Sequence, residues 1–429
     1  MGSMRSVWKD LDRFNKSAPD HARLELSRRL SAQMRYFGGR GDSLPEWREA
    51  ARMKDPSDLW RAWTDLPIMT KEDIKNRFNP GEMVRRFNLM GTASATGGST
   101  GEPTSFFHDY SMKRAVRAAS VYCWIQFGWR PGIPVVVIWG SERDVGKQRS
   151  LRGRVIYRLA DLHLVDGYAL GSSTVDRVLD LVVKHRPVVM YGFTGMLEFL
   201  AREVLSGKRG VAAGDVLSAW NGGEMLVESQ SRMFRRAFGV DIRNYYGGRE
   251  LGPMAFDSEE SPCLRVLRPF LFLEIVDDFG KPVAPGQIGR LVWTSTVCRG
   301  TPFLRYDIGD MGTWEPEDAD ESGIRRIRRL HGRKGDVFLL PHGKTISGLF
   351  WNHLFKDYPQ VNRFQVVLTR ERGIKLLLQG QGFSAEQEAG LKRVLAGTVG
   401  AVPVAVSWME SIPLSPQGKL VQVINEWEA

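Results

Sequence analysis

In its middle third the chain alternates short apolar runs with amphipathic stretches, and this pattern restricts the fold more than any other feature. PVVVIWG (134–140) and VVMYG (188–192) have the length and composition of buried strands. STVDRVLDLVVKHRP (173–187) and TGMLEFLAREVLSG (194–207) have apolar residues at helical spacing, the latter with Thr194 as its expected cap. Strands that alternate with helices predict a mainly parallel sheet, which binds ligands at the carboxyl ends of its strands.

The last part of the chain has a different pattern. NRFQVVLTRERGIKLLLQ (362–379) predicts a hairpin, SAEQEAGLKRVLAG (384–397) a helix opened by a capping box, and VPVAVSWM (402–409) a third strand. We therefore expect an α/β protein with two domains. Residues 1–331 form a large N-terminal domain of mainly parallel or mixed sheets with flanking helices, and residues 332–429 form a small, mobile α+β C-terminal domain.

The composition excludes several classes of protein. No apolar run is long enough to cross a membrane, and the N-terminus lacks the apolar core of a signal peptide. Three widely separated cysteines, Cys123, Cys263 and Cys298, suit a reducing compartment, so we expect a cytoplasmic protein. The formal charge is +11, and its densest cluster, IRRIRRLHGRKGD (324–336), lacks the interleaved aromatic residues of a nucleic-acid platform. The excess charge is either a solvated surface or an attraction for a phosphate-bearing small molecule.

The run SATGGSTGEPTS (94–105) consists of small residues that cannot pack a core. It is either a flexible surface linker or a phosphate cradle, in which glycines let backbone N–H groups converge on an anion. It does not match the common P-loop pattern, which needs Gly-Lys-Ser/Thr at its end.

Four later stretches carry charged residues in glycine-rich or polar turns. Each alone is most simply a solvated loop or turn. Their side chains could also serve one nucleotide, since carboxylates bind Mg²⁺ or ribose hydroxyls and cations bind phosphates. The stretches and their residues are NYYGGRELGP (244–253) with Glu250, RYDIGDMG (305–312) with Asp310, GRKGD (332–336) with Arg333, and PLSPQGKL (413–420) with Lys419.

Taken in order, together with TGGSTGEPT (96–104) and WNGGE (220–224), these stretches resemble the adenylate-forming enzymes. That superfamily includes acyl-CoA synthetases and the adenylation domains of peptide synthetases. The details resemble its phenylacetate–CoA ligase branch, which includes the CapK-type proteins. The resemblance runs from roughly residue 60 to the C-terminus.

The resemblance implies a role for each matching residue. The glycine loop closes over the β- and γ-phosphates of ATP, the glycine-glutamate stretch packs against adenine, the aromatic-glycine motif lies near adenine and the acyl group, and an aspartate and an arginine bind the ribose. The matching nucleotide-binding residues are Thr96, Gly98, Ser99, Thr100, Gly101, Gly222, Gly223, Glu224, Tyr245, Tyr246, Gly247, Asp310 and Arg333. The expected acid pocket comprises Tyr191, Phe193, Trp220, Tyr245 and Gly247.

The resemblance assigns the chemistry to two residues. Lys419 matches the catalytic lysine, whose cation stabilises the negative charge that builds up when a carboxylate attacks the α-phosphate. Glu250 matches the catalytic glutamate that binds Mg²⁺. Three positions depart from the family pattern: Glu102 stands where the loop often has lysine, Arg249 where Thr or Ser is usual, and Gly335 at the hinge.

The implied reaction has two steps. A carboxylic acid and MgATP give acyl-AMP and pyrophosphate, and the acyl group then passes to coenzyme A; the substrate is a small aryl or arylacetic acid. The implied cofactors are ATP, Mg²⁺ and coenzyme A, or the phosphopantetheine of a carrier protein. We expect no zinc site at Cys263, because no histidine lies near it in the sequence, and no nucleic acid or membrane partner; the branch implies a homodimer.

Two alternatives stay open. The acyl group could pass to an acyl carrier protein or an amine in natural-product or polysaccharide biosynthesis. The chain could also be a non-catalytic nucleotide-binding or basic nucleic-acid-binding protein, although the retention of Glu250, Asp310, Arg333 and Lys419 argues against this.

Overall fold

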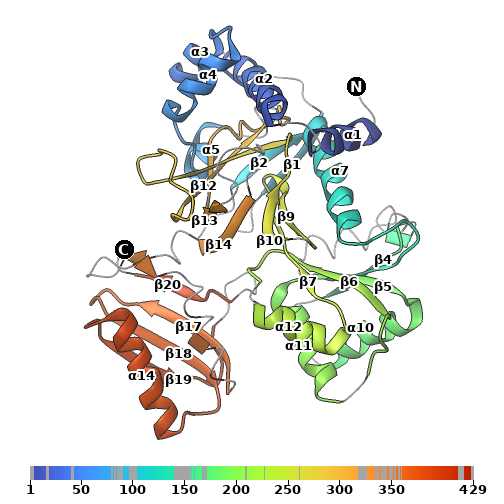
Figure 1. Ribbon diagram of the computed structural model, residues 1–429, viewed down its shortest axis with the longest axis vertical. Coiled ribbons are helices and arrows are strands. Elements are labelled where there is room, and N and C mark those ends of the chain that lie inside the picture. The colour runs from blue at the N-terminus through green and yellow to red at the C-terminus, as the bar shows by residue number, and fades with distance from the viewer. Residues whose placement is uncertain are drawn as a thin grey trace.

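The computed structural model describes most of the chain and leaves out several internal segments. The described ranges are 4–15, 19–39, 43–78, 90–95, 104–139, 160–166, 172–207, 210–226, 228–259, 261–316, 326–333, 338–339, 345–346, 360–413 and 420–426, with isolated residues between some of them. In Figure 1 the N-terminal helices lie at one end of the molecule, two sheets follow, and the last strands form a unit of their own.

The N-terminal region before the first sheet is helical. Proline is the first residue of three of the N-terminal helices, where its missing N–H leaves no hydrogen bond unmade. None of the described helices is long and apolar enough to cross a membrane. The helices before the first sheet are α1 (Met4–Asn15), α2 (Pro19–Gly38), α3 (Pro45–Ala51), α4 (Pro56–Ala62) and α5 (Lys71–Arg77), and α7 (Tyr110–Gln126) follows the first hairpin.

The alternating segment forms a five-stranded parallel sheet in the order β4-β3-β5-β6-β7, which confirms the prediction. The amphipathic helices bury their apolar faces on it, with Val182, Leu197 and Phe234 all fully enclosed. Its strands are β3 (Val135–Trp139), β4 (Leu162–Asp166), β5 (Val188–Gly192), β6 (Val216–Asn221) and β7 (Ile242–Arg243), and its helices are α10 (Ser172–His185), α11 (Thr194–Leu205) and α12 (Glu228–Phe238).

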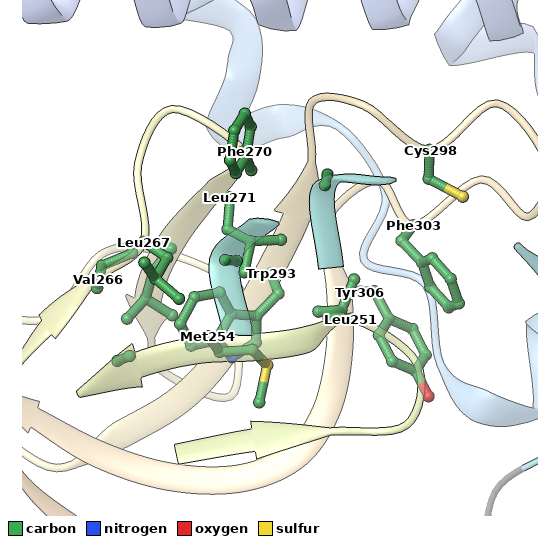
Figure 2. Close-up of a cluster of buried hydrophobic side chains, with 14 of the residues drawn as sticks. Leu251, Met254, Val266, Leu267, Phe270, Leu271, Trp293, Cys298, Phe303 and Tyr306 are labelled. Carbon is green, nitrogen blue, oxygen red and sulfur yellow. The ribbon is translucent and has the colours of Figure 1, made fainter. Parts of the chain in front are cut away.

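A second, antiparallel sheet of seven strands has the order β11-β12-β13-β14-β10-β9-β8. Figure 2 shows the hydrophobic cluster that it buries, in which the Tyr306 ring packs 5.2 Å from that of Phe303. The strands are β8 (Tyr245–Gly248), β9 (Gly252–Ser258), β10 (Ser261–Val266), β11 (Leu271–Val276), β12 (Gly289–Ser295), β13 (Tyr306–Trp314) and β14 (Arg326–Arg333).

The C-terminal strands form a separate four-stranded sheet, β19-β18-β17-β20, with a hydrophobic core of its own. The predicted hairpin, capping-box helix and third strand are all present, as β17 (Val361–Leu368) with β18 (Ile374–Gly380), α14 (Ala385–Val399) and β19 (Val404–Trp408). The sequence did not indicate β20 (Val423–Asn425), which pairs in parallel with β17.

The α/β class with a large N-terminal and a small C-terminal part is therefore confirmed. The boundary at residue 332 stays a prediction. β14 continues to Arg333, so residues 332 and 333 pair within the large antiparallel sheet. Between that sheet and β17 lie the short pair β15 (Phe338–Leu339) and β16 (Thr345–Ile346).

Candidate active site

The predicted phosphate loop is bracketed by a hairpin. β1 (Gly91–Ala95) and β2 (Ser105–Asp109) pair in antiparallel fashion, and Ala95 lies opposite Ser105. Residues 96–103 therefore connect two strands whose ends are held together. Thr96, Gly98, Ser99, Thr100, Gly101 and Glu102 lie outside the described residues, as do Gly335 and Lys419.

A chain of polar contacts joins Tyr246, Asp310 and Arg333, which come from three different strands. Asp310 and Arg333 are cross-strand partners on β13 and β14, and Arg333 Nε lies 2.9 Å from Asp310 Oδ1. The Tyr246 hydroxyl donates to Asp310 Oδ2 at 2.6 Å. Burial and the adjacent Asp310 carboxylate raise the pKa of Tyr246, so this hydroxyl stays a donor. β8 is the edge strand of this sheet and is not a neighbour of β13, so this hydrogen bond joins strands that do not pair with each other.

Glu250 lies beside these three residues and is buried in the turn after β8. Its Oε1 accepts a hydrogen bond of 3.3 Å from the Tyr306 hydroxyl at the start of β13. Its backbone carbonyl oxygen accepts one of 2.6 Å from Nε2 of His108 on β2. Burial lowers the pKa of His108, which favours the neutral ring with its proton on Nε2. The hairpin on either side of the predicted phosphate loop is thus hydrogen-bonded directly to Glu250.

Lys71, the first residue of α5, adds a cation that the sequence analysis missed. Burial lowers the pKa of its ammonium and so does Arg333, whereas Glu250, Asp310 and Asp307 act in the opposite direction. The capping box of Thr70 and Asp73 fixes the start of α5. Met69 pairs with Tyr306, which places this start beside β13. No sequence signal could have joined Lys71 to motifs more than 170 residues away.

The stretch 220–224 lies at the carboxyl end of β6, as expected for a ligand-binding edge. Both glycines are required by close packing. A Cβ at Gly222 would lie 2.7 Å from the Tyr191 hydroxyl, and Gly223 has φ +72° with only 2.9 Å from its Cβ position to the Phe193 ring. Here the chain runs close beneath aromatic rings that a larger residue would displace.

Thr194 does not cap α11, which corrects the sequence prediction. Phe193 occupies the cap position without a side-chain hydrogen bond, and Glu224 Oε2 accepts from the backbone N–H of Gly195 at 2.8 Å instead. A carboxylate from a distant loop therefore satisfies the start of the helix. Thr194 Oγ1 accepts from Asn221 Nδ2 at 3.0 Å.

Asn221, which the sequence analysis did not single out, links the two sheets. Its Oδ1 accepts from the backbone N–H of Tyr245 at 2.9 Å, while its Nδ2 donates to the Glu224 carbonyl oxygen at 3.0 Å. Asn221 is fully buried at the end of an apolar strand, and that position is the signal that could have identified it.

Aromatic rings cover this edge of the parallel sheet. Trp139 stacks on Phe193 at 4.0 Å and on Tyr191 at 5.1 Å, and Tyr191 lies 5.9 Å from Trp220 and 6.1 Å from Tyr245. The predicted pocket residues Tyr191, Phe193, Trp220 and Tyr245 thus form one cluster, although Trp220 is fully buried. Trp139 joins them without having been predicted.

The two remaining predicted features differ in their surroundings. Arg249 is exposed in the turn next to Glu250. Cys263 donates to Glu315 Oε2 at 2.8 Å and is not part of the group of three possible metal ligands found among the described residues. All three cysteines are free thiols.

The chain is similar to known proteins both in sequence and in structure. No family model matches the chain. It is 24% identical to the phenylacetate–coenzyme A ligase of Thermus thermophilus over 71% of this chain and 68% of that protein. It is 22% identical to the phenylacetate–coenzyme A ligase of Pseudomonas putida over 77% of this chain and 74% of that protein.

Among solved structures, a 2-hydroxyisobutyryl-CoA ligase in its postadenylation state matches with a TM-score of 0.74 at 17% identity, covering 97% of this chain and 92% of that one. The same ligase in its thioesterification state matches with a TM-score of 0.59 at 18% identity, over 96% and 91% of the two chains. The chain therefore has the fold of the adenylate-forming ligases, and phenylacetate–coenzyme A ligases are among its sequence relatives.

Proposed function

We propose that the protein activates a carboxylic acid with ATP as an acyl-adenylate and then transfers the acyl group to coenzyme A. The observation that carries the proposal is the contact of Tyr246, Asp310 and Arg333, which three separate motifs contribute to one place. The names of the sequence relatives support the same reaction.

The residues around Asp310 fit a nucleoside. The Asp310 carboxylate is oriented from both sides, by the Tyr246 hydroxyl and by Arg333, and an oriented carboxylate can accept hydrogen bonds from two neighbouring ribose hydroxyls. Arg333 is about half exposed (49%), so its guanidinium can reach a bound nucleotide. The Gly222–Gly223 backbone would form the flat surface against the base.

The residues around Glu250 fit Mg²⁺ brought by the nucleotide. Glu250 is a buried carboxylate, and hard divalent cations prefer oxygen ligands. Its Oε1 is oriented by the Tyr306 hydroxyl. Mg²⁺ would neutralise phosphate charge beside a carboxylate that is held in place before it binds.

Two cations serve the phosphates in this proposal. The loop carries Glu102 in place of the usual lysine. We propose that Lys71, the first residue of α5, supplies the missing positive charge. Its depressed pKa reflects a crowded, half-buried site with Arg333 close by, and bound polyphosphate would stabilise both cations. Lys419 would stabilise the negative charge that develops as the carboxylate attacks the α-phosphate.

The stacked rings of Trp139, Tyr191 and Phe193 support an aryl or arylacetic acid as the substrate. Flat aromatic faces favour offset or edge contacts with another ring, worth about 0.5–1.5 kcal/mol each beyond the area buried. Gly222 and Gly223 allow the backbone to approach these rings closely, where a side chain would displace them.

The two steps would use two arrangements of the large domain (1–331) and the small domain (332–429), with Gly335 as the hinge. Glycine tolerates the backbone angles that a pivot must adopt. The higher TM-score with the postadenylation state than with the thioesterification state of one ligase supports an arrangement suited to the first step.

The test is pyrophosphate release from MgATP across aryl, arylacetic, short aliphatic and amino acids, each with and without coenzyme A. We expect release with an aryl or arylacetic acid that rises when coenzyme A is added. Release that ignores coenzyme A would favour a carrier protein or an amine as acceptor, and release only with aliphatic acids would refute the aryl assignment.

Variants separate binding from chemistry. Lys419→Ala should abolish acyl-adenylate formation while nucleotide binding persists. Lys71→Met should raise the KM for ATP at least about tenfold, and Lys71→Arg should restore part of it because the charge is kept. Lys75→Met on the same helix is the matched control, since Lys75 is exposed and its substitution should leave KM unchanged.

A further inference from the structure

Three side chains able to ligate a metal ion meet at the start of β4, away from the candidate active site. Asp161 immediately precedes β4, His163 lies on it, and His185 is the last residue of α10. Each offers one ligand atom, and these atoms all lie within 4.8 Å of one another. Among the described residues this is the one such group of three His, Cys, Asp or Glu side chains.

The three ligand atoms are near enough for one ion to bind all of them after small side-chain movements. His163 Nε2 lies 2.9 Å from Asp161 Oδ1, and the imidazole rings of His163 and His185 have centroids 4.1 Å apart at 38°. Ligand atoms at the corners of a tetrahedron with metal–nitrogen distances of about 2.1 Å are about 3.4 Å apart. Small side-chain rotations therefore suffice to place all three atoms around one ion.

The backbone positions these residues independently of any ion. His163 pairs with Val136 in the parallel sheet, and the Asp161 carbonyl oxygen accepts from the Val135 backbone N–H at 2.9 Å. Asp161 has φ +50°, a left-handed conformation that aspartate tolerates better than most residues. Val182 anchors the end of α10 in the core next to His185.

We propose that Asp161, His163 and His185 bind Zn²⁺ or a similar borderline divalent cation. Two imidazoles and one carboxylate favour such an ion over Mg²⁺ or Ca²⁺, which prefer oxygen ligands throughout. The carboxyl end of α10 adds the partial negative charge of the helix dipole. All three side chains are partly exposed, so an ion can enter from solvent.

The ion would act on stability rather than on the reaction. Asp161 and His163 lie at the amino end of β4, whereas Gly222 follows the carboxyl end of β6. In a parallel sheet the amino ends and the carboxyl ends of the strands lie on opposite sides of the sheet. The proposed site is therefore separate from the candidate active site. An ion there would tie the end of α10 to β4 and stabilise the folded state only.

The test is metal binding by the full-length protein after treatment with a chelator, in the absence of nucleotide. Zn²⁺ is titrated in competition with a chromophoric chelator, and Co²⁺ is added as a spectroscopic probe of the ligand set. We expect one ion per chain, a visible Co²⁺ absorption band, and a rise in Tm with Zn²⁺ but not with Mg²⁺.

Three variants test the assignment. His163→Gln, His185→Ala and Asp161→Asn should each weaken Zn²⁺ binding at least about tenfold and remove the Tm rise. The control is His21→Ala, because His21 is exposed on α2, and it should bind as the unmodified chain does. Circular dichroism without metal checks that each variant is folded. Absence of stoichiometric binding, or binding that survives all three substitutions, would overturn the proposal. Neither result bears on acyl-adenylate formation.

Discussion

Replacing Arg305 should destabilise the large antiparallel sheet together with the segment that leads to α5. Arg305 immediately precedes β13 and is 2% exposed, and its Nη2 lies 3.1 Å from Glu274 Oε1. The guanidinium also donates to the backbone carbonyl oxygens of Thr64, Leu66 and Gly280. One side chain thus joins β11, β13 and the chain before α5, on which Lys71 lies.

The magnitude follows from what Arg305→Met would leave behind. Glu274 would stay buried, with the indole N–H of Trp63 at 2.9 Å as its remaining donor, and three carbonyl oxygens would lose their donor. Removing one partner of a buried ion pair costs about 3–5 kcal/mol, since the other charge is left uncompensated. We expect the free energy of unfolding to fall by about this amount.

The assay is urea unfolding followed by tryptophan fluorescence, with the midpoint and slope fitted for each variant. Arg305→Met combined with Glu274→Gln should recover part of the loss, because no unpaired charge remains. Arg61→Met is the control: its ion pair with Asp58 is exposed (79% and 58%), so the change should be below about 0.5 kcal/mol. A loss under about 1 kcal/mol for Arg305→Met, or no recovery in the double variant, would refute the reasoning.

Three further predictions concern the candidate site and the pH dependence of the protein's stability. Tyr246→Phe removes a hydrogen bond to the Asp310 carboxylate worth about 1.5–3 kcal/mol, so ATP binding measured by calorimetry should weaken about tenfold or more; unchanged affinity would argue against Asp310 as the ribose ligand. Gly223→Ala strains a residue at φ +72° and pushes against the Phe193 ring, so the KM values for the acid and for ATP should both rise, and an unchanged KM for the acid would contradict the assigned pocket. Burial lowers the pKa of His331 to about 4, below its unfolded value near 6.5, so its contribution to stability is complete above pH 6.5 and is lost as the pH falls toward 4. His331→Leu should therefore flatten the pH dependence of urea midpoints between pH 7 and 4.5, and parallel curves for the two proteins would show that another group is responsible.

The parallel sheet could be predicted because each of its helices and strands is indicated by the pattern of residues within its own short stretch of sequence. A buried strand needs only a short apolar run, and an amphipathic helix needs only its own period, as in Val135–Trp139 and Ser172–His185. The capping box of Ser384 and Gln387 is likewise local, and it is present. The predicted cap of α11 was wrong because the group that accepts from the start of this helix is not local. It is Glu224, from a loop 29 residues further along the chain.

In the candidate site too, the sequence indicated individual residues, whereas the contacts between them came only from the structure. Ordered motifs indicated Glu250, Asp310 and Arg333, and the structure adds that Asp310 and Arg333 are cross-strand partners and that the Tyr246 hydroxyl donates to Asp310. The roles of these residues, and of Lys419, stay predictions for experiment.

The sequence alone determined the α/β class, the change of pattern before the last domain and the order of the nucleotide motifs, because each depends on residues that are neighbours in the chain. Only the tertiary structure brought Lys71 to Glu250 and Asp310, and His185 to His163. Such contacts depend on how strands curl and which elements pack together, and these are set by the burial of the whole core rather than by any short stretch.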